Sequence, residues 1–317
     1  MPELPEVETI RLGLQRYIVG KKIEGVEVRL PKIVSGDPKN IIGAKVVDVR
    51  RFGKGLVTDL DNGYSIAIHI KLTGQLIYKG TEAAKETEET KVSIDKIGGE
   101  LPNKWTHAIF KIKNQKSKIK NTRLQLPSAK ADGGQASQKS KVGNDGNAYL
   151  YYNDVRQFGW IKIVKTSDVQ KLAFFKDLGP EFLNNLTMIQ FNNIVSSSNS
   201  LIKPLLMDQK KMSGIGNIYA NDALFEARID PRRKAKDLSD TEIETLYNAI
   251  LKVLKDGLKY GGATEINFVN VLGQEGGYQD HFLVYGREKQ PCRVCKTPIQ
   301  KIKLGGRGTY FCPKCQK

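Results

Sequence analysis

The amino terminus carries the residues with the clearest chemical potential. The chain begins with the letters MPELPE. Removal of the initiator methionine leaves Pro2 with a secondary amine at the end of the chain, a nucleophile that no internal residue can supply. Such an amine attacks a sugar carbon of aldehyde type and forms an iminium, or Schiff base, directly. Because an α-amino group has a pKa of roughly 7.7–8.0, a useful fraction is neutral near pH 7.

Two carboxylates follow this amine closely. Glu3 and Glu6 lie within about one helical turn of Pro2 in the sequence, and carboxyl groups at that range can move protons to and from a reacting group. The simpler alternative is that these residues only start a helix, since proline suits the first turn and acids suit the positive end of the helix dipole. Taken alone, the six residues favour that simpler interpretation.

A second chemical signal stands at the other end of the chain. All four cysteines form two pairs of CxxC spacing, sixteen residues apart: Cys292, Cys295, Cys312 and Cys315. This spacing is typical of four thiolates on one tetrahedral Zn²⁺, and four protein ligands leave no open position, so the zinc is expected to be structural. The residues between the pairs read as a β-hairpin that turns near Gly305 and Gly306. Arg307, next to this turn, is a candidate phosphate ligand, although a solvated basic tip is the alternative.

A glycine-rich segment precedes a helix in the second half. The letters GIGNIYA, residues 214–220, follow a helical stretch at 201–210 and open a new helix, with Asn217 as a possible cap. An exposed helix N-terminus beside glycines is a natural phosphate site, and Lys203 and Lys211 add positive charge nearby. An ordinary turn between two helices explains the segment equally well.

Composition narrows the class of partner. The 317 residues contain 51 Lys and Arg against 34 Asp and Glu, a net charge of +17. An excess of this size favours a polyanion, either nucleic acid or an anionic membrane surface. No apolar run approaches the roughly 20 residues of a membrane span. The acidic, proline-rich start does not resemble a secretory signal. We therefore expect a nucleic-acid-directed protein of the cytosol.

The first half reads as β structure behind one helix. Apolar residues at helical spacing predict a helix over 3–19 that ends at Gly20. Short strands are expected at 22–29, 44–49, 56–60, 64–70, 106–112, 148–152 and 160–164, with a hairpin turn at 61–63. This order predicts an antiparallel β-sandwich with the first helix packed at its edge, in a chain of α+β class.

Two polar stretches interrupt the strands. Residues 80–104 and 113–147 are predicted to be long, disordered insertions because they are rich in charged, Ser, Gln and Gly residues. The lysines of the second insertion could add nonspecific affinity for phosphates, or the insertion could be a passive loop.

After about residue 166 the apolar period becomes helical. Short helices are expected at 177–185, 188–197 and 201–210, and a capping box at Ser239 and Glu242 begins a longer one. The predicted organisation is a β-sandwich domain at 1–165, a hinge at 166–174, a helix–two-turn–helix domain at 175–286 and a zinc β-hairpin at 287–317.

Three motifs in this order resemble one known family. The PELPEVET start, the GIGNIYA segment and the terminal zinc hairpin are similar to those of formamidopyrimidine-DNA glycosylases, bacterial base-excision enzymes whose family also contains endonuclease VIII. The resemblance covers almost the whole chain except the two insertions, and the first motif is similar to the oxidised-purine branch. It implies a bifunctional DNA glycosylase and AP lyase that removes 8-oxoguanine and formamidopyrimidines through a Schiff base, followed by β- and δ-elimination.

The resemblance also implies roles for individual residues. Pro2 would attack C1′ of the damaged nucleotide, Glu3 would donate a proton and Glu6 would support it. Lys54 matches a lysine that contacts the phosphate beside the lesion. Asn217 matches a phosphate contact of the helix–two-turn–helix, Arg307 matches the arginine of the zinc hairpin, and Lys203 matches a further basic contact.

Family members also fill the gap left by the extruded nucleotide with side chains, which offsets part of the cost of unstacking. Leu72, Arg156 and Phe158 stand at the matching positions, although the family has Met at the first. Without the resemblance, core packing explains Leu72 and Phe158 as well. Three other departures concern the lesion spectrum and rate: Lys71 where Gly is frequent, Gly55 where Tyr is found and Asp222 where Glu is found.

The implied partner is damaged double-stranded DNA, bound by a monomer in the bacterial cytoplasm and nucleoid, with one structural Zn²⁺ and no membrane. Two alternatives stay open at this point. One is an endonuclease VIII-like specificity for oxidised pyrimidines. The other is a noncatalytic, zinc-containing DNA-binding protein, whose expected signature, loss of Pro2 or Glu3, is not found in this sequence.

Overall fold

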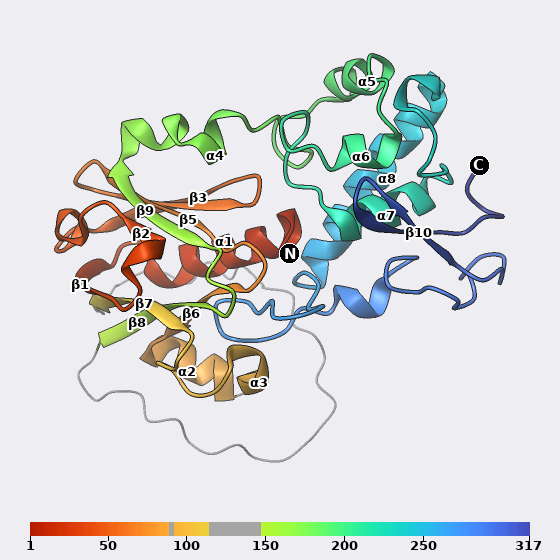
Figure 1. Ribbon diagram of the computed structural model, residues 1–317. Helices are drawn as coiled ribbons and strands as arrows, with labels where there is room; N and C mark the ends of the chain where they lie inside the picture. The colour runs from red at the N-terminus through yellow and green to blue at the C-terminus, as the bar shows by residue number, and fades with distance from the viewer. Residues whose placement is uncertain (89–91, 114–146) are drawn as a thin grey trace. The chain divides into compact units, whose positions relative to one another are not determined.

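The computed structural model describes residues 1–88, 92–113 and 147–317 (Figure 1). The chain forms two compact units. The first contains residues 1–175 together with 258–277, and the second contains 176–257 together with 278–317. The helical domain was expected to span 175–286 without interruption, whereas residues 258–277 belong to the first unit.

The first unit is built on two sheets. The four-stranded sheet has the order β1 (Lys22–Val28), β7 (Thr106–Lys113), β8 (Asn147–Asp154) and β6 (Gly74–Lys79). The five-stranded sheet has the order β2 (Val34–Ser35), β9 (Trp160–Lys165), β5 (Tyr64–His69), β4 (Gly55–Leu60) and β3 (Val46–Phe52). Neighbouring strands are antiparallel except for the two-residue pairing of β2 with β9, which is parallel. Short 3₁₀ turns flank β2 at Pro31–Ile33 and Pro38–Ile41.

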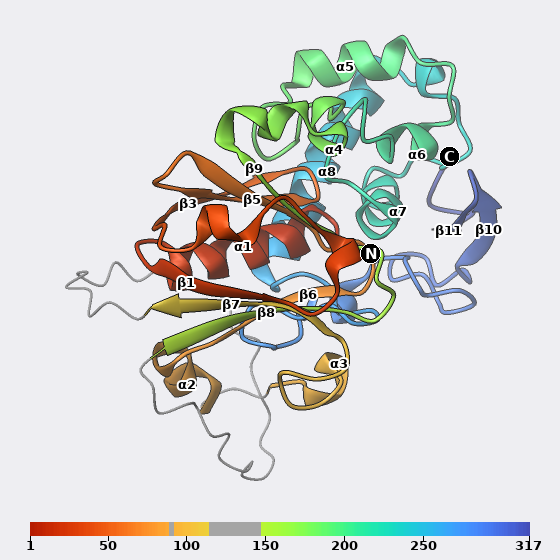
Figure 2. The ribbon, with the colours of Figure 1, turned by 60° about the vertical axis from the view of Figure 1, so that its left-hand side comes forward.

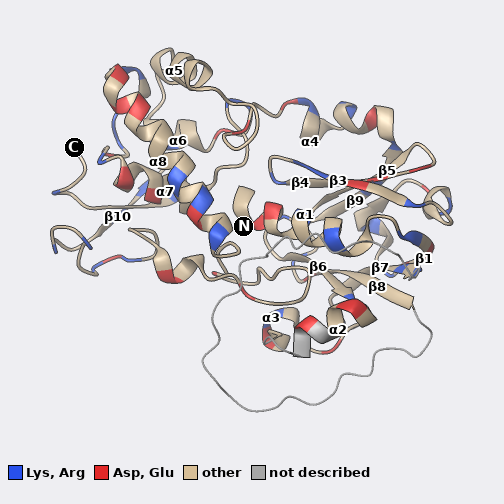
Figure 3. Ribbon diagram, turned by 180° about the vertical axis from the view of Figure 1, so that it is seen from behind, with Lys and Arg blue, Asp and Glu red and all other residues tan. Residues whose placement is uncertain are grey.

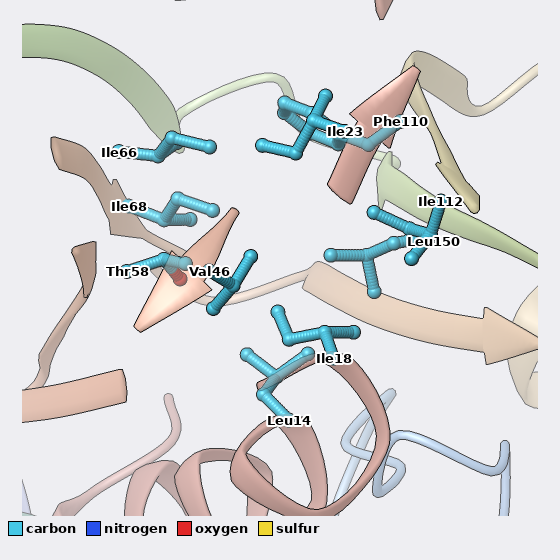
Figure 4. Close-up of a pocket in the computed structure, with 10 residues that line it drawn as sticks. All are labelled: Leu14, Ile18, Ile23, Val46, Thr58, Ile66, Ile68, Phe110, Ile112 and Leu150. Atoms are coloured by element: carbon cyan, nitrogen blue, oxygen red, sulfur yellow. The ribbon is translucent and has the colours of Figure 1, made fainter. Parts of the chain in front are cut away.

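The core lies between these sheets and is closed by helix α1, Leu4–Ile18 (Figure 2). The helix buries Val7, Ile10, Leu14 and Ile18, the face that the apolar spacing predicts. Side chains of α1 and of both sheets converge at the centre, where they line a narrow apolar gap (Figure 4). The predicted β-sandwich with a flanking helix is therefore confirmed.

Strand β6 was not among the predicted strands. Five of its six residues are buried, so its sequence, GQLIYK, lacks the alternation that marks a half-buried strand. As an edge strand, β6 is covered by the segment at 258–277, and its Tyr78 N–H donates to the Val271 carbonyl at 2.7 Å. Val271 also packs on α1, where a side chain at Gly13 would lie 2.3 Å from a Val271 methyl group.

The prediction that residues 80–104 are disordered is wrong for the part that the structure describes. Helix α2 (Thr81–Glu88) is held by Glu82, which pairs at 2.8 Å with Lys21 in the turn after α1, and by Glu86, which accepts the Tyr17 hydroxyl of α1 at 2.5 Å. Lys21 also donates to the Tyr78 hydroxyl of β6 at 2.9 Å. Helix α3 (Ile94–Ile97) buries Ile97. The pairing of these two carboxylates with Lys21 and Tyr17 orders the helix, and composition alone does not indicate such long-range partners. Of the second insertion, residues 114–146 lie outside the described residues; its ends, Lys113 and Asn147, pair with each other.

The second unit consists of several short helices, one long helix and one hairpin. Its elements are α5 (Met188–Ser196), α6 (Ile202–Leu206), α7 (Asn217–Glu226), a 3₁₀ turn at Ala235–Asp237, most of α8 (Asp240–Lys259), a 3₁₀ turn at Tyr278–His281, β10 (Gln300–Leu304) and β11 (Arg307–Phe311). The units are linked through a 3₁₀ turn at Thr166–Lys171 and α4, Ala173–Lys176. Helix α8 begins at the predicted capping box, with acidic residues near its start and basic ones toward its end, as the helix dipole favours (Figure 3).

Two predicted helices are corrected. Residues 177–185 form turns because their backbone bonds instead to 209–213: Gly179 N–H donates to the Gln209 carbonyl and Ser213 N–H to that of Pro180. The helix predicted at 201–210 ends at Leu206, and the Gln209 side chain then caps a turn by donating to Met207 and Ile215 carbonyls. Within the described residues, no helix combines the length and apolar character that crossing a membrane requires.

Candidate active site

The start of α1 holds Pro2 beside two buried carboxylates. Glu3 is the N-cap of the helix, and its backbone N–H donates to Glu6 Oε2 at 2.7 Å in a capping-box arrangement. The second oxygen of Glu6 accepts the Ala263 N–H at 2.7 Å. Pro2, Glu3 and Glu6 are all buried. The structure therefore brings the predicted nucleophile and both predicted acids together at one helix terminus and adds Ala263, which no sequence motif indicates.

Lys54 is positioned by an ion pair with the same helix. Arg51 on β3 donates to Glu8 of α1 at 2.8 Å and to the Gly53 carbonyl at 3.0 Å, which fixes the turn that carries Lys54. Burial alone would raise the pKa of Glu8, but its hydrogen bonds to Arg11 and Arg51 lower it below the usual value. The turn itself requires a left-handed residue, supplied by Gly53 at φ +56°. Glu8 and Arg51 thus join the Lys54 turn to α1.

An aromatic cluster lies against this turn and accounts for Gly55. A Cβ atom at Gly55 would lie 2.7 Å from the rings of both Phe174 and Phe175, so these rings occupy the space that a tyrosine side chain would need. His69 packs edge-on to Phe174 at a centroid distance of 4.5 Å. Burial, with smaller contributions from the charges of Lys71 and Lys54, lowers the pKa of His69 to about 3. His69 is therefore a neutral imidazole whose Nδ1 accepts the Lys71 N–H.

Leu72, Arg156 and Phe158 stand on two loops that share one buried carboxylate. Asp154 accepts the Thr73 hydroxyl at 2.5 Å through one oxygen and the Gly159 N–H at 2.8 Å through the other. The Arg156 N–H donates to the Thr73 hydroxyl oxygen at 3.0 Å. The loop of Leu72 is thereby fastened to the loop of Arg156 and Phe158.

One of these loops exposes Arg156 and Phe158, two of the side chains that the family resemblance implies for the gap in the DNA. Phe158 is 59% exposed, and the Arg156 guanidinium lies 4.8 Å from the centre of its ring. An exposed phenylalanine capped by arginine does not fit the core-packing interpretation of Phe158. Leu72 is half-buried. Lys71, in place of a frequent glycine, adopts φ +51°, the left-handed region that glycine accepts without strain.

In the second unit Lys203 links α6, α7 and the hairpin. Its Nζ donates to the Asn217 side-chain oxygen at 2.8 Å, to the Thr309 hydroxyl oxygen at 2.7 Å and to the Gly308 carbonyl at 3.0 Å. Lys203 is only 1% exposed. Asn217 is the first residue of α7, where Gly216 rather than Asn217 is the N-cap. Arg307 is exposed beside the Gly305–Gly306 turn.

The four cysteines form a metal site. Their sulfur atoms all lie within 4.8 Å of one another, with Cys295 and Cys312 sulfurs 3.4 Å apart and Cys292 and Cys315 sulfurs 3.9 Å apart. Four thiolates at Zn–S distances of about 2.3 Å place sulfurs roughly 3.8 Å from one another, so the geometry fits tetrahedral zinc. The knuckles flank the β10–β11 hairpin, whose tip is Gly305 and Gly306. The chain therefore binds one structural Zn²⁺ through these cysteines.

Asp222, the departure on α7, has a structural explanation. It is buried and accepts the backbone N–H groups of Leu283, Val284 and Tyr285 together with the Tyr278 hydroxyl. Burial raises its pKa, and these hydrogen bonds oppose that effect. Asp222 thus ties α7 to the segment that leads into the zinc module.

Sequence reasoning missed three residues of these clusters: Asp154, His69 and Ala263. Asp154 precedes the Arg156 and Phe158 motif by two and four residues, and His69 precedes Leu72 by three, so their proximity to recognised positions was an available signal. No sequence signal pointed to Ala263, because it acts only through a backbone N–H that donates to Glu6, 257 residues away in the chain.

Family models match three parts of the chain: the formamidopyrimidine-DNA glycosylase N-terminal domain at residues 1–161, the formamidopyrimidine-DNA glycosylase H2TH domain at 178–268, and a zinc finger found in FPG and IleRS at 289–317.

Individual relatives match over their full length. Formamidopyrimidine-DNA glycosylase of Pelotomaculum thermopropionicum is 37% identical over all of this chain and 99% of its own, and that of Streptococcus mutans is 35% identical over all of both. Among solved structures, Lactococcus lactis Fpg in complex with abasic-site DNA matches with a TM-score of 0.77 at 28% identity, covering 99% of each chain. MutM (Fpg) of Thermus thermophilus matches with a TM-score of 0.77 at 30% identity, covering 99% of this chain and 98% of its own.

The fold, the amino-terminal cluster and the zinc hairpin define a two-domain DNA glycosylase of base-excision repair with AP lyase activity. The chain belongs to the formamidopyrimidine-DNA glycosylase family.

Proposed function

We propose that this enzyme removes oxidised purines, 8-oxoguanine and formamidopyrimidines, from double-stranded DNA with Pro2 as the nucleophile. The observation that carries the proposal is the buried cluster at the start of α1, where Glu3 and Glu6 flank the residue whose amine is released with Met1. The structural relatives bound to abasic and Fapy-dG DNA support this class of substrate.

The chemistry follows from the amine and the acids. The Pro2 nitrogen attacks C1′ and forms a C–N bond, the glycosidic bond breaks, and the departing base takes a proton from Glu3. The Glu3 carboxylate then takes the proton of the attached amine and passes it to O4′ as the C1′–O4′ bond breaks, so that the sugar ring opens and the nitrogen lone pair forms the C=N bond. The resulting iminium makes the C2′ proton acidic. Its removal expels the 3′ phosphate by β-elimination, and a second elimination expels the 5′ phosphate. Glu6 holds the Glu3 backbone through a 2.7 Å hydrogen bond and so keeps the cluster in one arrangement.

Basic and amide side chains supply the phosphate contacts. We assign Lys54 to the phosphate beside the lesion, and Asn217 and the exposed Arg307 to the backbone around the extruded nucleotide. Lys203 is a positioning residue in this proposal, because it is buried and its ammonium donates hydrogen bonds to Asn217 and to β11. Arg307 favours the eliminations by neutralising phosphate charge.

Leu72, Arg156 and Phe158 are assigned to the gap that the extruded nucleotide leaves. The exposed Phe158 ring and the Arg156 guanidinium offer an apolar face and a charge to unstacked bases and phosphates. Extrusion costs a few kcal/mol of stacking, and inserted side chains recover part of it.

Borohydride trapping tests the proposal directly. Wild-type enzyme with a duplex containing one 8-oxoguanine is expected to give a covalent protein–DNA complex, because borohydride reduces the iminium. Pro2→Gly should lose most of it, whereas Pro5→Ala, an internal proline of the same helix, should retain it. Trapping on a thymine-glycol duplex but not on 8-oxoguanine would assign the oxidised-pyrimidine specificity instead. No trapping on any lesion or abasic site would refute the catalytic assignment.

We further propose that the enzyme acts as a monomer in the bacterial cytoplasm and nucleoid. Each duplex lesion needs one nucleophile, and the chain carries its own zinc module. Sedimentation of the protein with a lesion duplex should give one protein per DNA; a 2:1 complex at stoichiometric protein would contradict this.

A further inference from the structure

The segment at 258–277, here called the return segment, lies between the first insertion and the amino-terminal cluster. Its residues Phe268, Val271 and Leu272 join the main core of the first unit. At its beginning, Gly262 and Ala263 contact Glu6: the Ala263 N–H donates to Glu6 Oε1, and a Cβ atom at Gly262 would lie 2.9 Å from Glu6 Cγ. Displacement of this end therefore moves the Glu6 carboxylate.

The first insertion holds the other end of the return segment. The Ser93 N–H donates to the Gly273 carbonyl at 2.9 Å, and the Ser93 hydroxyl donates to Glu275 at 2.6 Å. A small apolar cluster joins Ile97 of α3 to Val269 and to Ile77 of β6. Packing at Gly273 is close, since a Cβ atom there would lie 2.7 Å from Ile97. Residues 92–98 of the insertion thus support residues 267–275.

Gln75 on β6 bonds to both the first insertion and the return segment. Its side-chain nitrogen donates to the Lys96 carbonyl at 2.8 Å and to the Asn267 carbonyl at 2.7 Å. Gln75 is buried, so the two carbonyls have no ready replacement by bulk water. An amide NH₂ group has two donors, and this geometry uses both.

Hydrogen bonds and adjacent residues thus connect α3 to the start of α1. Gln75 joins Lys96 to Asn267, and Ala263 joins the return segment to Glu6, which holds Glu3. Between Asn267 and Ala263, the hydroxyl of Thr264 donates to the Phe268 carbonyl at 2.8 Å. We propose that Gln75 and residues 92–98 of the insertion form a brace that positions Glu6 through the return segment, and thereby sets the rate of the chemical steps at Pro2. Gln75 is a positioning residue, since it acts through Glu6 and not on the substrate. This inference rests on the proposed function of Pro2.

The experiment compares Gln75→Leu and Gln75→Glu with wild type under single-turnover conditions. Leucine removes both donors, and glutamate places a carboxylate against two carbonyl oxygens. Both the excision of 8-oxoguanine and borohydride trapping on a preformed abasic site should slow by about tenfold, because a displacement of under 1 Å at a catalytic group has effects of this size. DNA affinity should stay within twofold. Ile94→Ala, an exposed side chain of α3, is the matched control and should change neither rate.

Two further measurements test whether Gln75 acts on the rate through the return segment and Glu6. Hydrogen exchange in peptides covering 262–276 should be faster in Gln75→Leu than in wild type or Ile94→Ala. In a Glu6→Gln background, Gln75→Leu should cause little additional loss, because residues that act through one another are not additive.

Three results would overturn the proposal: unchanged rates with faster exchange, slower excision with normal trapping on abasic DNA, or full additivity with Glu6→Gln. Absence of wild-type activity on both substrates would instead refute the proposed function on which the inference rests.

Discussion

The Lys203 ammonium lies 2.8 Å from the Asn217 side-chain oxygen, and this contact joins the two helices of the helix–two-turn–helix. The same ammonium reaches the Thr309 hydroxyl on β11, so one buried charge fixes the orientation of Asn217 and of the strand that begins with Arg307. Two proposed phosphate contacts therefore depend on a third residue that is itself buried.

Lys203→Met is expected to weaken binding of abasic duplex DNA by about tenfold, because it leaves the acceptors on Asn217, Gly308 and Thr309 without their charged donor. Hydrogen bonds to charged groups contribute roughly 1.5–3 kcal/mol, so the second unit should also unfold more easily. Fluorescence anisotropy and thermal unfolding measure the two effects. Lys255→Met, which changes an exposed lysine of α8, should change neither DNA binding nor thermal unfolding. Equal losses in both variants would contradict the assignment.

Asp154→Ala should slow excision of 8-oxoguanine and lower the free energy of unfolding by about 1–3 kcal/mol, because Thr73 and Gly159 lose their shared buried acceptor. Fluorescence of a 2-aminopurine opposite the lesion reports the extrusion step that Leu72 and Phe158 are proposed to support. Asp154→Asn keeps one acceptor oxygen, so its excision rate and its free energy of unfolding should lie between those of wild type and Asp154→Ala. Asp168→Ala, which removes an exposed pair with Lys171, is the control; normal extrusion in Asp154→Ala would exclude a role for the shared carboxylate.

His69 makes stability pH-dependent. Its folded-state pKa of about 3 lies below the ordinary value near 6.5, so between these values the unfolded chain binds the proton and the native chain does not. Stability from this group is present above about pH 6.5 and is lost as pH falls toward 3, by up to about 1.4 kcal/mol per pH unit. Urea unfolding from pH 7 to 4 should show a shallower decline in His69→Gln than in wild type. His281→Gln should follow wild type; an unchanged slope in His69→Gln would show that His69 is not the group responsible.

Gly55→Tyr, which introduces the residue that the family resemblance implies at this position, should destabilise the first unit by about 1–3 kcal/mol, because the Phe174 and Phe175 rings fill the site. Phe174→Ala on that background should recover part of the loss. Thermal unfolding measures both. A Gly55→Tyr variant as stable as wild type would mean that the aromatic cluster can move aside.

Removal of zinc should abolish tight binding of abasic DNA, because the four thiolates hold the hairpin that carries Arg307. Chelation confirmed by metal analysis, followed by anisotropy, tests this, and added Zn²⁺ should restore binding. Circular dichroism should show most secondary structure retained. Zinc-free protein that binds the duplex normally would exclude a role for the hairpin.

Local patterns were sufficient for much of the fold. The period of α1, the turn at residues 61–63 and the capping box at Ser239 depend on neighbours within a few residues, so the sequence predicts them directly. The sequence did not predict β6, because nearly all of its residues are buried and it therefore lacks the polar–apolar alternation of a half-buried strand. The helix expected at 177–185 does not form, because this segment makes backbone hydrogen bonds to residues 209–213. In both cases distant segments satisfied the backbone and overrode local preference.

The sequence by itself determined the chemistry of this protein: an amine beside two acids, four thiolates at zinc spacing and a large excess of positive charge. Those properties reside in residue types and short spacings. Only the tertiary structure decided that Lys203 is buried, that Asp154 fastens two loops, and that Ala263 and Gln75 connect an insertion to Glu6. Each of these depends on hydrogen bonds between groups up to 257 residues apart, and such contacts exist only once the chain has packed.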